Sequence, residues 1–181
     1  MTEEQELPIE DQNQDLDTAE IAANLPADAE RIFLVVVDGS DEMSVALRFA
    51  SRRAEHTNGR VALAYVVEPN DFGHWLGVDK LMQEEAREEA EQVLQRQGAV
   101  AQELTGKLPV LYLRFGNRRD EIIQLIDEEP SISIMVLASA PGSKNPGPLI
   151  SDFSSKFLGK LRVPITIVPG DLTIDQVDAI S

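Results

Sequence analysis

The residue best placed to do chemistry is Asp38, which comes directly after the apolar run of residues 32–37 and before Gly39 and Ser40. An apolar run without alternation predicts a strand that is covered on both faces, as in a parallel sheet. Such sheets bind small molecules beyond the carboxyl ends of their strands. The Asp38 carboxylate is therefore a candidate ligand contact, and it can equally serve a structural role by capping the helix that follows.

Other catalytic chemistry finds no support in the sequence. The chain has no cysteine, which excludes disulfides, thiolate nucleophiles and cysteine-based metal sites. The two histidines, His56 and His74, have no partner at metal-ligand spacing, so we assign no metal site. No Ser-His-Asp arrangement and no pair of general acid and base is visible. We therefore name no catalytic residue and favour a protein that is not an enzyme.

The net charge of −16 belongs mostly to the two ends of the chain. Residues 1–30 hold ten acids and no base, and residues 171–181 hold three more acids, which leaves the body at only −3. Nucleic acid requires a clustered positive footprint, so we expect no nucleic-acid partner. No segment has the roughly 18 apolar residues of a membrane helix or the pattern of a secretory signal, which predicts a cytoplasmic protein with no membrane partner.

Composition divides the chain into an acidic arm, a central α/β domain and an acidic C-terminal tail, at residues 1–29, 30–170 and 171–181. The arm carries only scattered apolar side chains and cannot bury enough surface to offset the entropy of ordering, which predicts disorder. Within it, Ile21, Ala22 and Leu25 could form one apolar helical turn that docks on the body. A solubilising tail is the simpler interpretation.

Apolar segments rich in Val, Ile and Leu alternate with amphipathic segments through the central domain. The predicted strands are residues 31–38, 60–67, 108–115, 131–139 and 163–169. The predicted helices are residues 41–56 with Ser40 as cap, 76–104, 118–127 with Asn117 as cap, and 152–161. Right-handed crossovers then predict an α/β fold with a five-stranded parallel doubly wound sheet, in the order 3-2-1-4-5, and helices on both faces. In that order the Asp38 turn and the loop after Ser139 border one crevice.

Two loops near this crevice carry motifs of their own. The aromatic loop of residues 71–75 is either a lid over the crevice or, as we favour, a seat for the second helix on the sheet. Residues 142–147 have the G-x4-G spacing of a Walker A loop, but Pro148 and Leu149 follow where Lys and Ser or Thr are needed. That loop therefore does not predict a P-loop, although its Lys144 could neutralise an anion.

Together the segments resemble the universal stress protein family, of the UspA type. The resemblance covers nearly the whole central domain and rests on the order and spacing of five segments. These are VVVDGSDEMSVALRFA, VALAYVVEP, FGNRRDEIIQLIDE, SISIMVLAS and FLGKLRVPITIVPG. It implies the doubly wound fold. In nucleotide-binding members the first strand ends in an aspartate, matched here by Asp38, and the second offers main-chain groups to adenine, at a position matched by Val66.

The resemblance fails at the glycine motif that takes phosphates in those members, G-x2-G-x9-G-S/T. The four matching positions hold Ala138, Pro141, Ser151 and Asp152. Phosphates are held by backbone N–H groups of glycine-rich turns and by the positive end of a helix. Pro141 has no N–H to donate, and Asp152, expected in the first turn of the last helix, would occupy the place of an anion.

We therefore expect a non-enzymatic stress-response or regulatory factor that has lost ATP binding and needs no cofactor. The alternative is an adenine-nucleotide sensor or slow ATPase that binds ATP in the crevice. A third possibility is that the crevice takes an uncharged or monophosphate adenine compound, such as adenosine or AMP. The residues that would form this crevice are Asp38, Gly39, Ser40, Val66, Ser139, Gly142 and Ser143.

The last predicted strand also suggests a partner. Residues 163–168 are apolar and lie at the edge of the predicted sheet. Proteins ordinarily cover or pair such an edge, because its backbone groups are otherwise open to association. The sequence therefore predicts a homodimer through the edge strand Val163 to Val168.

Overall fold

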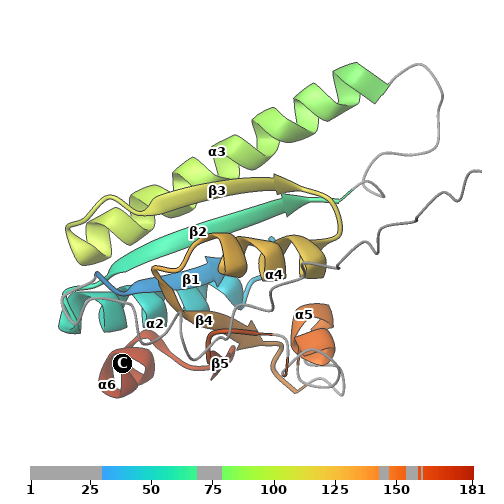
Figure 1. The fold of residues 1–181 in the computed structure, drawn as a ribbon. Coiled ribbons are helices and arrows are strands. Elements are labelled where there is room, and N and C mark those ends of the chain that lie inside the picture. Colours follow the sequence, from blue (N-terminus) through green and yellow to red (C-terminus); the bar gives the residue numbers. More distant parts are fainter. Residues whose placement is uncertain (1–29, 69–78, 143–146, 154–158, 160) are drawn as a thin grey trace, which may run out of the picture.

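The structure is a computed structural model that describes residues 30–68, 79–142, 147–153, 159 and 161–181. Five parallel strands form one sheet in the order β3-β2-β1-β4-β5, which confirms the predicted fold (Figure 1). The strands are β1 (Ile32–Val36), β2 (Arg60–Val67), β3 (Val110–Phe115), β4 (Ile132–Ser139) and β5 (Ile165–Pro169). The predicted arm and the aromatic loop of residues 71–75 lie outside the described residues, so both stay predictions.

Helices cover both faces of the sheet. They are α2 (Met43–His56), α3 (Asp79–Thr105), α4 (Arg118–Glu128), α5 (Pro148–Asp152) and α6 (Ile174–Ile180). One hydrophobic core lies between the sheet and α2 with α3, and a second lies between the sheet and α4 with α5. Alternate residues of β1 enter the two cores, with Phe33 and Val35 in the first and Leu34 and Val36 in the second. That double burial explains why the strand is apolar throughout.

The start of α2 differs from the prediction. The helix begins at Met43, and Ser40 is not its cap, because the N-cap residue is Glu42 without a side-chain capping bond. Instead the Ser40 N–H donates to Asp38 Oδ1 at 3.0 Å, and Gly39 has a φ of +76°. An aspartate that binds the backbone two residues on closes a turn of its own, so the helix starts later.

The start of α5 also corrects the prediction. Gly147, with a φ of +113°, precedes Pro148 at the beginning of the helix. Proline is favoured at the first helical position, since its missing N–H is unpaired there in any case. Asp152 is therefore the last residue of α5 and not part of a first helical turn. Our expectation that Asp152 occupies the anion position at a helix start is wrong. Residues 154–158 and 160 of the predicted helix lie outside the described residues.

The last residues of the chain form a docked helix. Residues 171–181 contain α6, which begins with a capping box between Thr173 and Gln176. Asp178 accepts hydrogen bonds from the Arg48 guanidinium of α2 at 2.6 and 2.8 Å and from Arg52 Nε at 3.2 Å. Val177 is buried against the domain. Composition alone describes this segment only as acidic, whereas two arginines of α2 hold it in place.

Candidate functional site

A cavity of about 100 Å³ lies at the carboxyl ends of β1 and β4, beside the starts of α2 and α5. Its polar lining comes from Asp38, Ser40 and Glu42. The remaining lining is almost entirely apolar and includes Val36, Met43, Ala46, Leu137, Leu149 and Ile150. The crevice that the strand order predicts is therefore present, at the place where doubly wound sheets bind their ligands.

The Asp38 turn is shaped by the backbone around it. Asp38 Oδ1 accepts the Ser40 N–H, whereas Oδ2 has no hydrogen bond from any residue that the structure describes. Gly39 supplies the positive φ of +76° that the turn needs, a conformation that costs glycine little and other residues more. The structural role of Asp38 is therefore to close this turn and not to cap α2, whereas its role as a ligand contact stays a prediction.

The electrostatics of the cavity favour neutral or cationic groups. Asp38 and Glu42 both bring carboxylates to the lining, and no Lys or Arg from the described part of the chain lines it. Two like charges without a counter-ion make the local potential negative. An anion that enters such a cavity is repelled instead of held.

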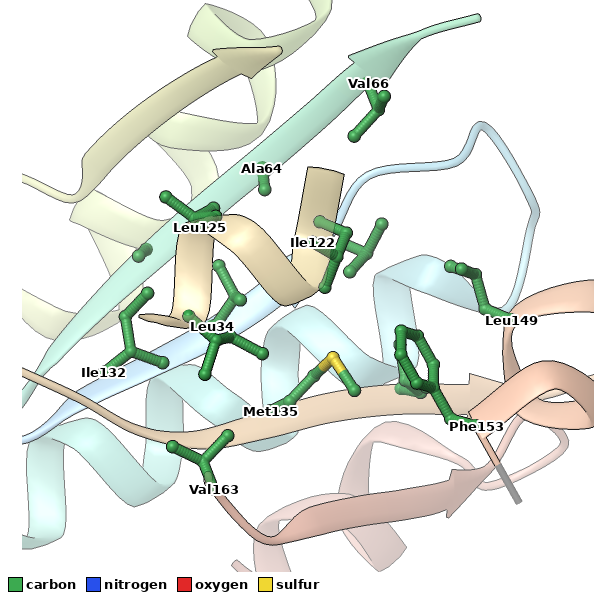
Figure 2. Close-up of a cluster of buried hydrophobic side chains, with 14 of the residues drawn as sticks. Leu34, Ala64, Val66, Ile122, Leu125, Ile132, Met135, Leu149, Phe153 and Val163 are labelled. Atoms are coloured by element: carbon green, nitrogen blue, oxygen red, sulfur yellow. The ribbon is translucent and has the colours of Figure 1, made fainter. Parts of the chain in front are cut away.

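Apolar side chains close the cavity on the side of β4. Leu149 of α5 is 6% exposed, and Phe153, directly after that helix, is 1% exposed. Figure 2 shows both side chains at the carboxyl end of β4, on the face of the sheet that carries Ile122 of α4. Leu149 therefore gives the α5 side of the cavity an apolar surface, and Phe153 lies in the core behind it.

β2 contributes no described side chain to the cavity lining, although the sequence suggests a contact at Val66. The Val66 side chain is buried in the core beneath α4 and does not line the cavity (Figure 2). The register between β1 and β2 ends at Val36 opposite Ala64, so Val66 lies beyond the last paired residue of β1. Next to it, Glu68 binds the Arg118 N–H and guanidinium, both at 3.2 Å, which ties the end of β2 to α4.

The loop after β4 provides few of the predicted contacts. The carbonyl of Ser139, the last residue of β4, accepts the Gly170 N–H at 2.9 Å just after β5, and Ser139 does not line the cavity. Gly142 is exposed with a φ of +63° and does not line the cavity either. Ser143 lies outside the described residues. Of the six predicted residues that the structure describes, Asp38 and Ser40 line the cavity and the other four do not.

Several lining residues were missed by the sequence interpretation. Glu42 follows Asp38 by four residues and directly precedes α2, so no helical spacing relates the two carboxylates and no local sequence signal indicates that both line the cavity. Leu149 and Ile150 fall in the loop before the predicted helix of residues 152–161, and their position beside the cavity depends on the earlier start of α5 at Pro148. Among the residues that the structure describes, no group of three or more His, Cys, Asp or Glu could hold a metal ion. No described helix is long and apolar enough to span a membrane.

The fold and the cavity define a doubly wound α/β domain with a ligand crevice at its topological switch point. The family pattern described as the universal stress protein family matches residues 30–169, and the chain belongs to that family. No curated protein sequence shows a significant match.

Solved structures show the same fold. The universal stress protein UspA from Lactobacillus plantarum superposes with a TM-score of 0.62 at 18% identity, covering 76% of this chain and 97% of that one. A universal stress family protein from Burkholderia pseudomallei superposes with a TM-score of 0.59 at 23% identity, covering 80% of this chain and 99% of that one. The universal stress protein from Archaeoglobus fulgidus in complex with dAMP superposes with a TM-score of 0.51 at 20% identity, covering 77% of this chain and 97% of that one. At these identities the likeness establishes the fold alone.

Proposed function

We propose that this universal stress protein is a non-enzymatic regulatory or stress-response factor whose crevice does not take ATP. The observation that carries the proposal is the crevice itself, which Leu149 and Ile150 of α5 line with apolar side chains. Ligand pockets usually enclose about 300–1,000 Å³, whereas this cavity measures about 100 Å³. A triphosphate with its magnesium ion is a poor fit in both size and charge.

The charge of the lining supports the same conclusion. A triphosphate needs backbone N–H groups or cations around it. The described lining offers the carboxylates of Asp38 and Glu42 instead. Pro141, in the loop after β4, has no N–H to give. Binding would therefore place like charges together without compensation.

Thermal unfolding of the full chain with and without millimolar Mg-ATP tests this proposal, after heat-released material is checked for copurified nucleotide. A ligand present at 100 times its dissociation constant adds about 2.7 kcal/mol. For a chain of this size that corresponds to a rise in Tm of about 5–10 °C. We expect no rise. A saturable rise that Asp38→Ala abolishes would overturn the proposal and identify an ATP-binding crevice.

A second candidate is a site for adenosine or a nucleoside monophosphate. It is favoured by the free Oδ2 of Asp38, which can accept a hydrogen bond from a ribose hydroxyl or an amino group. A relative with the same fold was solved in complex with dAMP. The same unfolding experiment with adenosine and with AMP separates the candidates: a Tm rise with either ligand and none with Mg-ATP supports the smaller ligand.

We further propose that the protein is a homodimer through β5. This strand is the last of the sheet, and its Ile167 side chain is 45% exposed. An uncovered apolar edge is a ready template for a second copy. Light scattering should report a dimer for the native chain and a monomer for Ile167→Lys. The matched control, Leu108→Lys, changes a residue that is 69% exposed before the opposite edge strand and should remain a dimer. A native monomer would contradict the proposal.

A further inference from the structure

A second hollow lies on the outer side of α2, away from the crevice. This groove measures about 270 Å³ and runs between α3 and the C-terminal segment. Its lining is mainly aliphatic and includes Val45 of α2, Val100 and Leu104 of α3, and Leu172, Ile174 and Val177 at the C-terminus. Val100 is 44% exposed and Ile174 is 61% exposed. The groove therefore offers aliphatic side chains, two of them well exposed, against which a further apolar segment can pack.

The groove depends on the docked C-terminal helix. One of its walls is the segment that includes α6, which Arg48 and Arg52 hold through Asp178. The floor is α2 and the opposite wall is the C-terminal part of α3. The groove is therefore a fixed feature of the folded chain, built from three elements.

We propose that the groove is the docking site of the chain's own N-terminal arm, through Ile21, Ala22 and Leu25. This inference is independent of the proposed function of the crevice. In a helical turn the spacing of the three residues places their side chains on one face. That face matches the aliphatic lining of the groove in chemistry.

The point at which the arm joins the body supports this occupant. Glu30, the first described residue, pairs with Lys107 Nζ at 3.0 Å and with Arg60 Nε at 3.0 Å. Lys107 comes only three residues after Leu104, which lines the groove. The arm therefore leaves the body beside the α3 end of the groove.

The length of the arm also fits. An extended chain covers at most about 3.3–3.6 Å per residue, so the five residues from Leu25 to Glu30 reach roughly 17 Å. The α3 wall between Val100 and Leu104 extends about 6 Å along the helix axis. The linker between Leu25 and Glu30 is therefore longer than this wall, which is consistent with an arm that docks while Glu30 keeps its ion pairs.

Charge and tethering add to the fit. Arg96 is exposed, lies one helical turn before Val100 and makes no ion pair with any described residue. The acids that flank the apolar turn, Glu20 among them, carry the opposite charge. A tethered segment acts at an effective concentration of about millimolar, so even a weak contact is occupied within one molecule.

Paramagnetic relaxation in the full chain tests the proposal, and the absence of native cysteine makes single labelling simple. A nitroxide on Ala23→Cys, next to the three docking residues but not one of them, should remove most of the amide signal intensity at Val100, Leu104 and Ile174. The matched control is a nitroxide on Gln5→Cys in the same arm, which should leave these signals unchanged. Equal effects from both labels, or no effect from either, would overturn the proposal.

Two further experiments decide what occupies the groove. The first experiment mixes two kinds of chain: one carries the nitroxide but no isotope label, and the other carries the isotope label but no nitroxide. The groove signals, which come from the second kind, should keep their intensity. Loss in that mixture would mean that a second copy fills the groove, which contradicts docking within one chain. Val100→Asp, at an exposed position, should restore the signals of Leu104 and Ile174 in the singly labelled chain, whereas Ala99→Asp, exposed but outside the lining, should not. Equal behaviour of the two variants would also contradict it.

Discussion

Arg162 holds together the end of the sheet that lies opposite the crevice. Its Nη2 donates to the carbonyl oxygens of Ile126 at 2.6 Å, Glu129 at 3.0 Å and Ile132 at 3.4 Å. The first of these carbonyls belongs to the last turn of α4, where helix carbonyls have no partner within the helix. Burial lowers the pKa of Arg162 from its ordinary value, and the Asp127 carboxylate opposes that shift. Replacing Arg162 by Met should remove this donor from all three carbonyls, although the Glu129 carbonyl keeps the Ile132 N–H at 3.0 Å.

The size of the effect follows from these contacts. Hydrogen bonds from a charged donor contribute about 1.5–3 kcal/mol, and burial of the guanidinium offsets part of that. We therefore expect Arg162→Met to lower the free energy of unfolding by about 2 kcal/mol. For a chain of 150–250 residues this corresponds to a fall in Tm of about 4–8 °C. Arg162→Lys keeps the charge but not the planar fork, so its loss should be intermediate.

Urea denaturation of the two Arg162 variants measures the loss directly. The control is Arg87→Met, which breaks a surface ion pair with Glu91 at 2.9 Å. Exposed pairs of this kind contribute at most about 0.5 kcal/mol on a helix. If Arg162→Met lowers the free energy of unfolding no more than Arg87→Met does, then water satisfies the carbonyls. In that case Arg162 does not stabilise the end of α4 as we infer.

Three other changes have defined outcomes. Phe153→Ala removes a ring that is 1% exposed and should lower the free energy of unfolding by about 3–5 kcal/mol in urea denaturation; a loss below about 1 kcal/mol would mean that the ring is not core. The hydrogen bond from Arg48 lowers the pKa of Asp178 from 3.8 to about 2, against the opposing effect of burial. Because the folded pKa is the lower one, the stabilisation of α6 is present above about pH 4 and lost as the pH falls towards 2. Amide exchange in α6 should accelerate across that window, and Asp178→Asn should abolish the dependence. Gly170→Ala would place a Cβ 2.6 Å from Glu42 Cβ, which should cost about 1–3 kcal/mol in thermal unfolding, and an unchanged Tm would contradict this packing.

The sheet could be predicted from the sequence because its signals are strong and local. β1 is buried on both faces, so Phe33 and Leu34 are both apolar and the strand pattern is unambiguous. The strand order follows from the handedness of the crossovers. The cap of α4 is also a local signal, and Asn117 accepts the Asp120 N–H as predicted.

The helix ends and the site depend on less local effects. Ser40 has the residue type of a cap, but Asp38 takes its N–H first and moves the start of α2. Gly147 followed by Pro148 is a local signal for the start of α5. We missed it because the match to the glycine motif placed Asp152 in the first turn of the helix. The apolar lining by Leu149 and Ile150 could not be predicted, because it depends on how α5 packs beside the ends of β1 and β4 in three dimensions.

The strand order also has a consequence during synthesis of the chain. β1 pairs with β2 on one side and with β4 on the other, and 64 residues separate the end of β2 from the start of β4. At about 5–20 residues per second, a ribosome needs roughly 3–13 s to produce them. Throughout that interval one edge of the most apolar strand has no neighbour to pair with. The nascent chain is then most exposed to misassociation and to chaperones that bind hydrophobic strands.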